Sequence, residues 1–232
     1  MTDTIPYDIE NWKRYPNAFK VGEPVVITGK LHGTFFQLGW RRALEPSALL
    51  FGDGRAYITS KGLAAKEIVL QNTPENASNL YVRAARESNL LSELMAYAEV
   101  HGSLEAITFF GEVIGAGVQD LAYGHSANGI SLRVFDVYLG PTHEGQFLPH
   151  EDVEKLCYIL GVSTVPLLGC EPFEPEILEK YARGTTTLGA GHIREGIVIK
   201  PAVERYDPRF GRVILKYINE DYLIRKDGTE YN

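Results

Sequence analysis

Short apolar and aromatic runs, broken by glycine and proline, follow one another along most of this 232-residue chain. Valine, isoleucine, phenylalanine, tyrosine and threonine dominate the runs, and these residues favour β-strands. The pattern predicts strands at Pro24–Gly29, Thr34–Trp40, Ala56–Ser60, Ala106–Val113, Ser131–Tyr138, Gly196–Lys200 and Val213–Ile218. A chain with so many short strands is expected to build its core on sheets.

Three further segments have the features of helices. Asn79–Ala98 carries leucine and alanine near helical spacing, and Glu151–Leu160 and Pro175–Arg183 have acidic residues in the first turn. Strands and helices do not alternate regularly, so a doubly wound parallel sheet is disfavoured and an α+β fold of antiparallel sheets is expected. No flexible connection is long enough to separate two domains, so residues 1–232 are expected to form a single domain.

Composition excludes several classes of protein. Apolar residues make up 44% of the chain and charged residues 23%, as in folded globular proteins. No run reaches the roughly 20 apolar residues of a membrane span, and the N-terminus lacks the pattern of a secretion signal. The net charge is −7, and the acidic excess lies in the middle of the chain, which is unlike a simple DNA-coating protein but leaves room for a basic groove built from both ends. Cys157 and Cys170 belong to no CxxC pair, which favours a reducing cytoplasmic setting without zinc or disulfides.

Two short motifs place a charged residue at the end of a predicted strand, beside glycine. Lys30-Leu31-His32-Gly33 follows directly on the first strand, and its glycine lets the backbone approach a ligand closely. Glu112 stands at the end of an aromatic strand, ahead of a loop with several glycines. Taken singly, each motif also fits an ordinary strand followed by a turn.

Two further motifs lie near the C-terminus. Alternation along Glu195–Pro201 directs Glu195, Ile197 and Ile199 to one face of a strand and Lys200 to the other. Arg212–Lys216 is a basic strand that ends in a lysine. These two motifs, taken singly, are also compatible with purely structural strands.

In this order the motifs resemble those of the covalent nucleotidyltransferases, and specifically of ATP-dependent RNA ligases. The correspondence places Lys30-Leu31-His32-Gly33 at motif I, Thr59-Ser60-Lys61-Gly62 at motif Ia, Phe110-Gly111-Glu112 at motif III, Val134–Val137 at motif IIIa, Glu195–Pro201 at motif IV and Ile214–Lys216 at motif V. From about Asp8 to Lys226 the chain is most similar to the Deinococcus and Naegleria type of RNA ligase. The resemblance implies a nucleotidyltransferase (adenylyltransferase) domain with an ATP-grasp-like ligase catalytic fold.

The chain departs from the family pattern at two positions. Gly29 stands where a glutamate usually precedes the motif I lysine, and Ile214 stands where motif V usually has its first lysine. Arg212, two residues earlier on what is predicted to be the same strand face, is the candidate to supply the missing charge. The departures bear on rate and donor specificity more than on the type of reaction.

The resemblance implies that Lys30 accepts AMP from ATP, that AMP then moves to an RNA 5′-phosphate, and that a 3′-hydroxyl displaces it. An ordinary lysine has a pKa near 10.4, so only about one amine in a thousand is neutral at physiological pH. Lys200, Lys216 and a metal ion are expected to lower the pKa of Lys30 and to offset charge on the triphosphate.

The resemblance also implies ATP and Mg²⁺ or Mn²⁺ as cofactors. Glu112 and Glu195 are the expected metal ligands, because Mg²⁺ prefers carboxylate and phosphate oxygens. Phe135 is expected to stack on adenine, with Val198 on the opposite side, although both residues also fit a plain core. The other expected nucleotide-binding residues are Leu31, His32, Gly33, Glu112, Lys200 and Lys216.

The expected partners are RNA ends or nicked duplexes with a 5′-phosphate and a 3′-hydroxyl, in RNA repair, with no membrane and with the protein as a monomer. Lys61 is implied to hold phosphate by its motif Ia position. Arginine and lysine supply the sequence-independent part of nucleic-acid binding. Further candidates of this kind are Arg41, Arg42, Arg83 and Arg86, each of which also fits a solvated surface charge.

Two other functions stay open at this stage. One is a nucleotidyltransferase with another donor or acceptor, such as a DNA ligase or an mRNA capping enzyme, against which His32 and the Val113–Gly124 loop argue. The other is a non-catalytic domain that binds RNA ends, for which Gly29 and Ile214 argue. Only 29 residues precede Lys30 and 16 follow Lys216, so no OB or C-terminal module is expected. We therefore expect AMP transfer to Lys30 to persist, with end joining slow and sensitive to salt.

Overall fold

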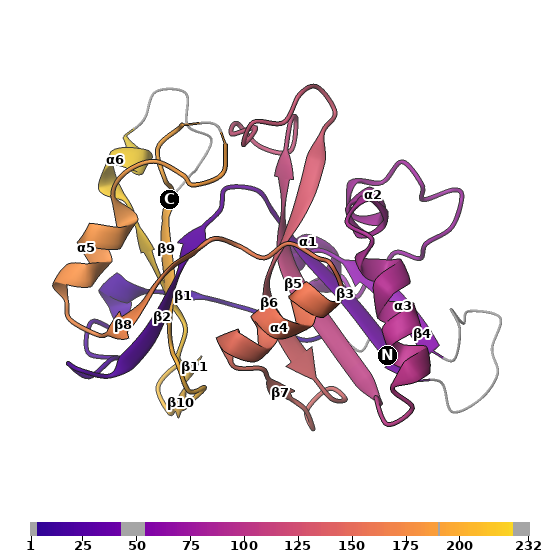
Figure 1. The fold of residues 1–232 in the computed structure, drawn as a ribbon, viewed down its shortest axis with the longest axis horizontal. Coiled ribbons are helices and arrows are strands. Elements are labelled where there is room, and N and C mark those ends of the chain that lie inside the picture. The colour runs from indigo at the N-terminus through magenta and orange to yellow at the C-terminus, as the bar shows by residue number, and fades with distance from the viewer. Residues whose placement is uncertain (1–3, 43–53, 190, 225–232) are drawn as a thin grey trace. The chain divides into compact units, whose positions relative to one another are not determined.

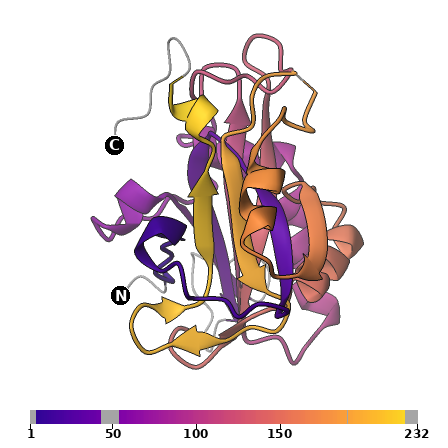
Figure 2. The same ribbon diagram turned by 90° about the vertical axis from the view of Figure 1, so that its left-hand side faces the viewer.

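The computed structural model describes residues 4–42, 54–189 and 191–224 (Figures 1 and 2). The chain divides into two compact units that are interleaved in sequence. Unit 1 comprises Met1–Tyr7, Thr34–Val113 and Ile130–Thr164, and unit 2 comprises Asp8–Gly33, Ile114–Gly129 and Val165–Asn232. The chain passes between the units without a linker, and one passage falls within a strand, so composition carries no signal of the division.

Unit 1 is built on a five-stranded sheet in the order β4-β3-β5-β6-β7 (Figure 1). Its strands are β3 (Thr34–Arg42), β4 (Gly54–Thr59), β5 (Ala106–Gly115), β6 (Ile130–Leu139) and β7 (Gln146–Phe147). Its helices are α1 (Lys61–Ala64), α2 (Leu80–Glu87), α3 (Leu90–Val100) and α4 (His150–Ile159). Helices α2 and α4 both contact β6.

The single helix predicted over Asn79–Ala98 is in fact two helices. Helix α2 ends at Glu87, and α3 begins at Leu90. Asn89 between them has a φ of +58°, a left-handed conformation that asparagine adopts more readily than most residues. The periodicity of the apolar residues continues across this break, which is why the sequence pattern did not reveal it.

Unit 2 is built on a second five-stranded sheet, in the order β1-β12-β9-β2-β8 (Figure 2). The strands are β1 (Glu10–Asn11), β2 (Pro24–Lys30), β8 (Leu167–Pro172), β9 (Gly196–Pro201) and β12 (Leu215–Ile218), all paired antiparallel except β1 with β12. A small hairpin, β10 (Tyr206–Asp207) and β11 (Gly211–Arg212), and three short helices complete the unit. These helices are η1 (Trp12–Arg14), α5 (Glu176–Ala182) and α6 (Glu220–Leu223).

One face of the unit 2 sheet forms its hydrophobic core. Ile27, Ile197 and Ile199 have no exposed surface, and Ile177 and Leu178 of α5 pack over them. This leaves the opposite face of β2 and β9 to carry the polar residues of the predicted site. The α+β class is therefore confirmed. Among the described helices none is both long and apolar enough to cross a membrane.

Candidate active site

Strand register in unit 2 brings four predicted site residues onto one face of the sheet. On adjacent strands Val198 lies opposite both Thr28 of β2 and Lys216 of β12. Directly opposed residues share a face, as do residues two apart along a strand. Lys30, Val198, Lys200 and Lys216 therefore share the face that points away from the isoleucine core. The alternation predicted for Lys200 against Ile197 and Ile199 is confirmed. The placement of Glu195 with the two isoleucines is wrong, because Glu195 precedes β9 and its side chain contacts Lys30.

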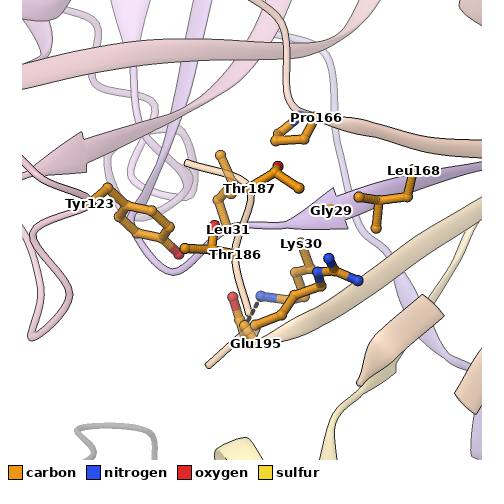
Figure 3. A pocket seen from close by; sticks show the side chains of 10 residues that line it. Gly29, Lys30, Leu31, Tyr123, Pro166, Leu168, Thr186, Thr187 and Glu195 are labelled. Carbon is orange, nitrogen blue, oxygen red and sulfur yellow. Dashed lines mark hydrogen bonds and ion pairs between the residues drawn. The ribbon is translucent and has the colours of Figure 1, made fainter. Parts of the chain in front are cut away.

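Lys30 forms an ion pair with Glu195, 165 residues further along the chain (Figure 3). The Glu195 side chain is fully buried, and that of Lys30 is 23% exposed. Figure 3 shows the lysine amine directed at the carboxylate, in a pocket that Gly29, Leu31 and Tyr123 also line. An ammonium has no lone pair, so a lysine must lose a proton before it can act as a nucleophile, and Glu195 is a carboxylate in contact with this amine.

Asn219 holds the backbone on which Glu195 is mounted. Its side-chain amide donates to the carbonyl of Arg194 at 3.1 Å, and its backbone N–H donates to the carbonyl of Glu195 at 2.9 Å. Its side-chain oxygen also accepts from the backbone N–H of Asp221 at 3.1 Å and caps α6. Asn219 is buried. One side chain therefore fixes both the Glu195 segment and the start of a helix.

Arg194, next to Glu195, anchors the same segment to the end of α5. Its guanidinium donates to three backbone carbonyls, those of Tyr181, Arg183 and Thr185. Carbonyls at a helix C-terminus lack intrahelical partners and attract cations. Burial lowers the pKa of Arg194 from its usual value. Sequence reasoning did not single out Arg194 or Asn219, and neither lies in a recognisable motif.

Two contacts from one loop hold His32. Its ring Nε2 is paired with the carboxylate of Asp120, and its backbone N–H donates to the hydroxyl of Tyr123 at 2.7 Å. Its ring packs in a T-shaped arrangement with that of buried Tyr222, with ring centroids 5.8 Å apart. The glycine-rich loop after β5 thus reaches back to motif I. Asp120 was not predicted, and an acidic residue within that loop is the only signal the sequence offered.

The sequence-based placement of Arg212 on the same strand as Lys216 is wrong. Arg212 belongs to β11, which pairs with β10, and β12 begins only at Leu215. Its guanidinium pairs instead with Glu204, whose carboxylate lies 3.5 Å from the Lys200 amine. Ile214 is buried in the intervening segment, where an apolar side chain is favourable.

Two predicted nucleotide residues lie in unit 1, and both are half-buried. Glu112 is opposite Phe35 across β3 and β5. Phe135 lies among aromatic rings, with its centroid 5.3 Å from that of Tyr7 and 6.3 Å from that of Phe35. The Tyr7 hydroxyl donates to buried Asp136 at 2.6 Å. The adenine-stacking role of Phe135 stays a prediction.

The candidate phosphate-binding cations also lie in unit 1, and several have local partners. Lys61 is exposed at the start of α1, and Arg41 is exposed on β3. Arg83 pairs with Glu87 at 3.0 Å, and Arg86 donates to Asn72. Arg42 donates to the carbonyls of Ala98, His101 and Leu104, so it caps the end of α3. Arg42 thus has a structural task that the sequence did not indicate.

The two carboxylates predicted to bind metal belong to different units, Glu112 to unit 1 and Glu195 to unit 2. Over the described ranges no group of three or more His, Cys, Asp or Glu side chains could by itself enclose an ion. Oxygen donors in small number suit Mg²⁺ or Mn²⁺, because such ions retain water and phosphate ligands.

Comparison with known proteins gives one family and one fold. A family model described as RNA ligase matches residues 23–218. No curated protein matches the chain. Solved structures similar to it include three of Naegleria gruberi RNA ligase: a lysine-to-alanine variant with ATP and Mn (20% identity, TM-score 0.69), a lysine-to-methionine variant with AMP and Mn (21%, 0.70), and the ligase with pyrophosphate (20%, 0.69).

Each of these alignments covers 96% of this chain and 58% of the solved chain. The chain therefore spans little more than half the length of the solved proteins that it matches. At this level of identity the likeness shows a shared fold.

Proposed function

Because the chain belongs to the RNA ligase family, we propose that it is an ATP-dependent RNA ligase that joins 5′-phosphate and 3′-hydroxyl ends through a lysine–AMP intermediate. The observation that carries the proposal is the shared sheet face of Lys30, Lys200 and Lys216, with Glu195 in contact with the Lys30 amine. One nucleophile, further cations and a carboxylate are what nucleotidyl transfer from a triphosphate requires.

In the first step the Lys30 nitrogen attacks the α-phosphorus of ATP. A phosphorus–nitrogen bond forms, the bond to the bridging oxygen breaks, pyrophosphate leaves, and the amine proton passes to the Glu195 carboxylate that contacts it. Lys200 and Lys216 offset the charge that develops on the leaving pyrophosphate. Lys200 is almost fully buried and Lys216 half-buried, and electrostatic stabilisation is stronger where water is excluded.

We propose that Phe135 and Val198 bind adenine and that Leu31 and Gly33 contact the nucleotide through motif I. His32 is proposed to act mainly by holding motif I in shape, because its ring and its backbone N–H contact Asp120 and Tyr123. Glu112 and Glu195 would hold Mg²⁺ or Mn²⁺, which supplies further neutralisation of the triphosphate charge.

The residues proposed to contact RNA lie in unit 1. Lys61, Arg83 and Arg86 are proposed to contact RNA phosphates, as exposed or half-exposed cations of unit 1. We propose that the two units act together as one nucleotidyltransferase domain. The substrate is proposed to be a nicked duplex or a pair of RNA ends in RNA repair, with the protein acting as a cytoplasmic monomer.

The test is covalent labelling. Purified protein with Mg²⁺ and α-³²P-ATP is expected to acquire a label that survives SDS and alkali but not hot acid, as a lysine phosphoramidate does. Lys30→Ala should abolish labelling, whereas the matched variant Lys66→Ala, which removes an exposed lysine of unit 1, should label as wild type does. Equal labelling of the Lys30 variant would reject the nucleophile.

The same labelling assay separates the alternatives. Preference for GTP, or sealing of DNA nicks over RNA nicks, would favour a different nucleotidyltransferase. Gly29 and Ile214 are the two positions that favour a non-catalytic RNA-end-binding domain, and that function predicts ATP or RNA binding without any label. A panel of four labelled nucleotides with RNA and DNA acceptors distinguishes all three.

A further inference from the structure

The side chains of Leu132 and Arg133, which are neighbours in β6, lie on opposite faces of the unit 1 sheet. A Cβ atom on Gly111 would lie 2.7 Å from Cδ1 of Leu132, so Leu132 fills the space over Gly111. Gly111 is directly opposite Phe36, and therefore Leu132 and Phe36 share the buried face. Successive strand residues point to opposite faces, which places Arg133 on the other face.

That other face carries the predicted nucleotide residues of unit 1. Phe35 and Glu112 are opposite one another across β3 and β5, and each is one residue from the Phe36–Gly111 pair. Phe135 is two residues beyond Arg133 along β6, and its ring contacts that of Phe35. Residues two apart in a strand are about 7 Å apart. The side chain of Arg133 can therefore reach a ligand that contacts Phe135.

Arg133 also differs from the other arginines in the described part of the chain. Its side chain forms no hydrogen bond or ion pair with any described residue, and its Nε is buried without a hydrogen-bond partner there. Burial lowers the pKa of Arg133, with no described acid or acceptor to offset it. By contrast, Arg205 and Arg212 are paired with carboxylates, and Arg42 and Arg194 with carbonyls.

A half-buried guanidinium without an acceptor is unfavourable, because it loses hydration and gains no compensating contact. An anion with several oxygens would replace the lost hydration and would supply the missing hydrogen-bond acceptors. Phosphate suits a guanidinium best, since the planar fork can donate two parallel hydrogen bonds to it.

We propose that Arg133 binds a phosphate group on the face of the unit 1 sheet that carries Phe35, Glu112 and Phe135. The proposal deepens the proposed function, because it assigns a phosphate ligand to a residue outside the predicted site. The phosphate belongs either to the nucleotide whose base contacts Phe135 or to the 5′ end of the RNA. The two sources share one chemistry and are separated by the experiment.

The test measures binding without catalysis, so that it does not depend on lysine–AMP formation. In a Lys30→Met background, Kd is measured for ATP, for 5′-phosphorylated RNA and for 5′-hydroxyl RNA. Arg133→Met is expected to raise the Kd of the ligand that carries the bound phosphate at least tenfold, the order of magnitude for losing a charged hydrogen bond. Arg133→Lys, which keeps the charge but not the fork, should recover part of the affinity. Arg14→Met, at an exposed surface pair, is the control and should leave all three constants unchanged.

Loss of ATP affinity alone assigns the nucleotide phosphate. Loss confined to 5′-phosphorylated RNA assigns the RNA end. Unchanged affinity for all three ligands overturns the proposal. Thermal unfolding of the ligand-free variants adds a second readout, because removing an uncompensated buried charge should leave Tm equal or higher. A fall in Tm of Arg133→Met without any change in Kd would show that Arg133 is structural. Absent labelling in the wild type, with these binding losses intact, would reject only the ligase activity.

Discussion

Arg212 donates hydrogen bonds of 2.7 and 2.6 Å to the two carboxylate oxygens of Glu204. One of these oxygens also lies 3.5 Å from the Lys200 amine. The side chains of Arg212, Glu204 and Lys200 are only 8%, 13% and 5% exposed. Glu204 therefore shares its single negative charge between Arg212 and Lys200. It orients the Lys200 amine without cancelling the positive charge of that amine. The cluster keeps a net positive charge at the end of β9.

Replacing Arg212 should therefore leave the Glu204 carboxylate without its two shortest hydrogen bonds. Arg212→Met is expected to lower the free energy of unfolding by about 3 kcal/mol, as breakage of buried ion pairs does. The double variant Arg212→Met/Glu204→Gln should recover part of that loss, which urea unfolding can measure. Arg209→Met removes an exposed arginine of the same hairpin and should cost at most about 1 kcal/mol. Equal losses for the two single variants would contradict the buried role of Arg212.

The carboxylates provide a test of metal use. Glu112→Ala and Glu195→Ala should each reduce lysine–AMP labelling by a large factor, because each removes an oxygen ligand suited to Mg²⁺. Both variants should keep the wild-type circular dichroism spectrum. For Glu112→Ala, raised Mg²⁺ or Mn²⁺ should restore part of the rate. Full activity of both variants would place these carboxylates outside the site.

Asn219 is expected to act through Glu195 as a positioning residue. Asn219→Ala removes the hydrogen bond to the Arg194 carbonyl and the cap of α6, and loss of such a cap costs about 1 kcal/mol. The labelling rate at saturating ATP should fall by more than this loss of stability explains. Asn79→Ala removes the matching cap of α2 in unit 1 and is the control. An Asn219 variant no slower than the Asn79 variant would argue against positioning.

Gly196 should tolerate no side chain. A Cβ there would lie 2.2 Å from the backbone oxygen of Tyr217, where β9 pairs with β12. Gly196→Ala is expected to destabilise the protein by about 3 kcal/mol, because a backbone atom must move and the strand pairing with it. Gly62→Ala is the matched control, since open space surrounds that position and alanine favours its helix. Thermal unfolding of the two variants makes the comparison.

The stability contributed by Glu23 should depend on pH. Burial raises the pKa of Glu23, but hydrogen bonds and charge from Arg205 and Lys20 lower it by more in total. A carboxyl with a lowered pKa in the folded state stabilises the fold above its unfolded pKa, and the effect is lost as pH falls through the folded value. Glu23→Gln should therefore destabilise the protein at pH 7, by about 1–2 kcal/mol, and much less near pH 3. Glu220→Gln, at an exposed pair, should show little difference between the two pH values.

The helix prediction for Asn79–Ala98 shows where local patterns mislead. Leucine and alanine spacing identified both helices there, yet the break at Asn89 depends on one left-handed residue that the periodicity does not register. Strand β8 was missed because Leu167–Pro172 contains glycine, glutamate and proline, and its place in the sheet comes from pairing with β2.

Local sequence determined most of the longer strands, the face of β9 that carries Lys200, and the ordered motifs that identify the family, because alternation and motif order are properties of the chain itself. Only the tertiary structure decided that Glu195 meets Lys30, that Asp120 holds His32, and that Arg212 acts on Glu204. The two residues of each such pair lie from 8 to 165 positions apart in the sequence, and strand register and the path of the loops bring them into contact. That register is a result of packing the whole sheet, and no short window of sequence contains it.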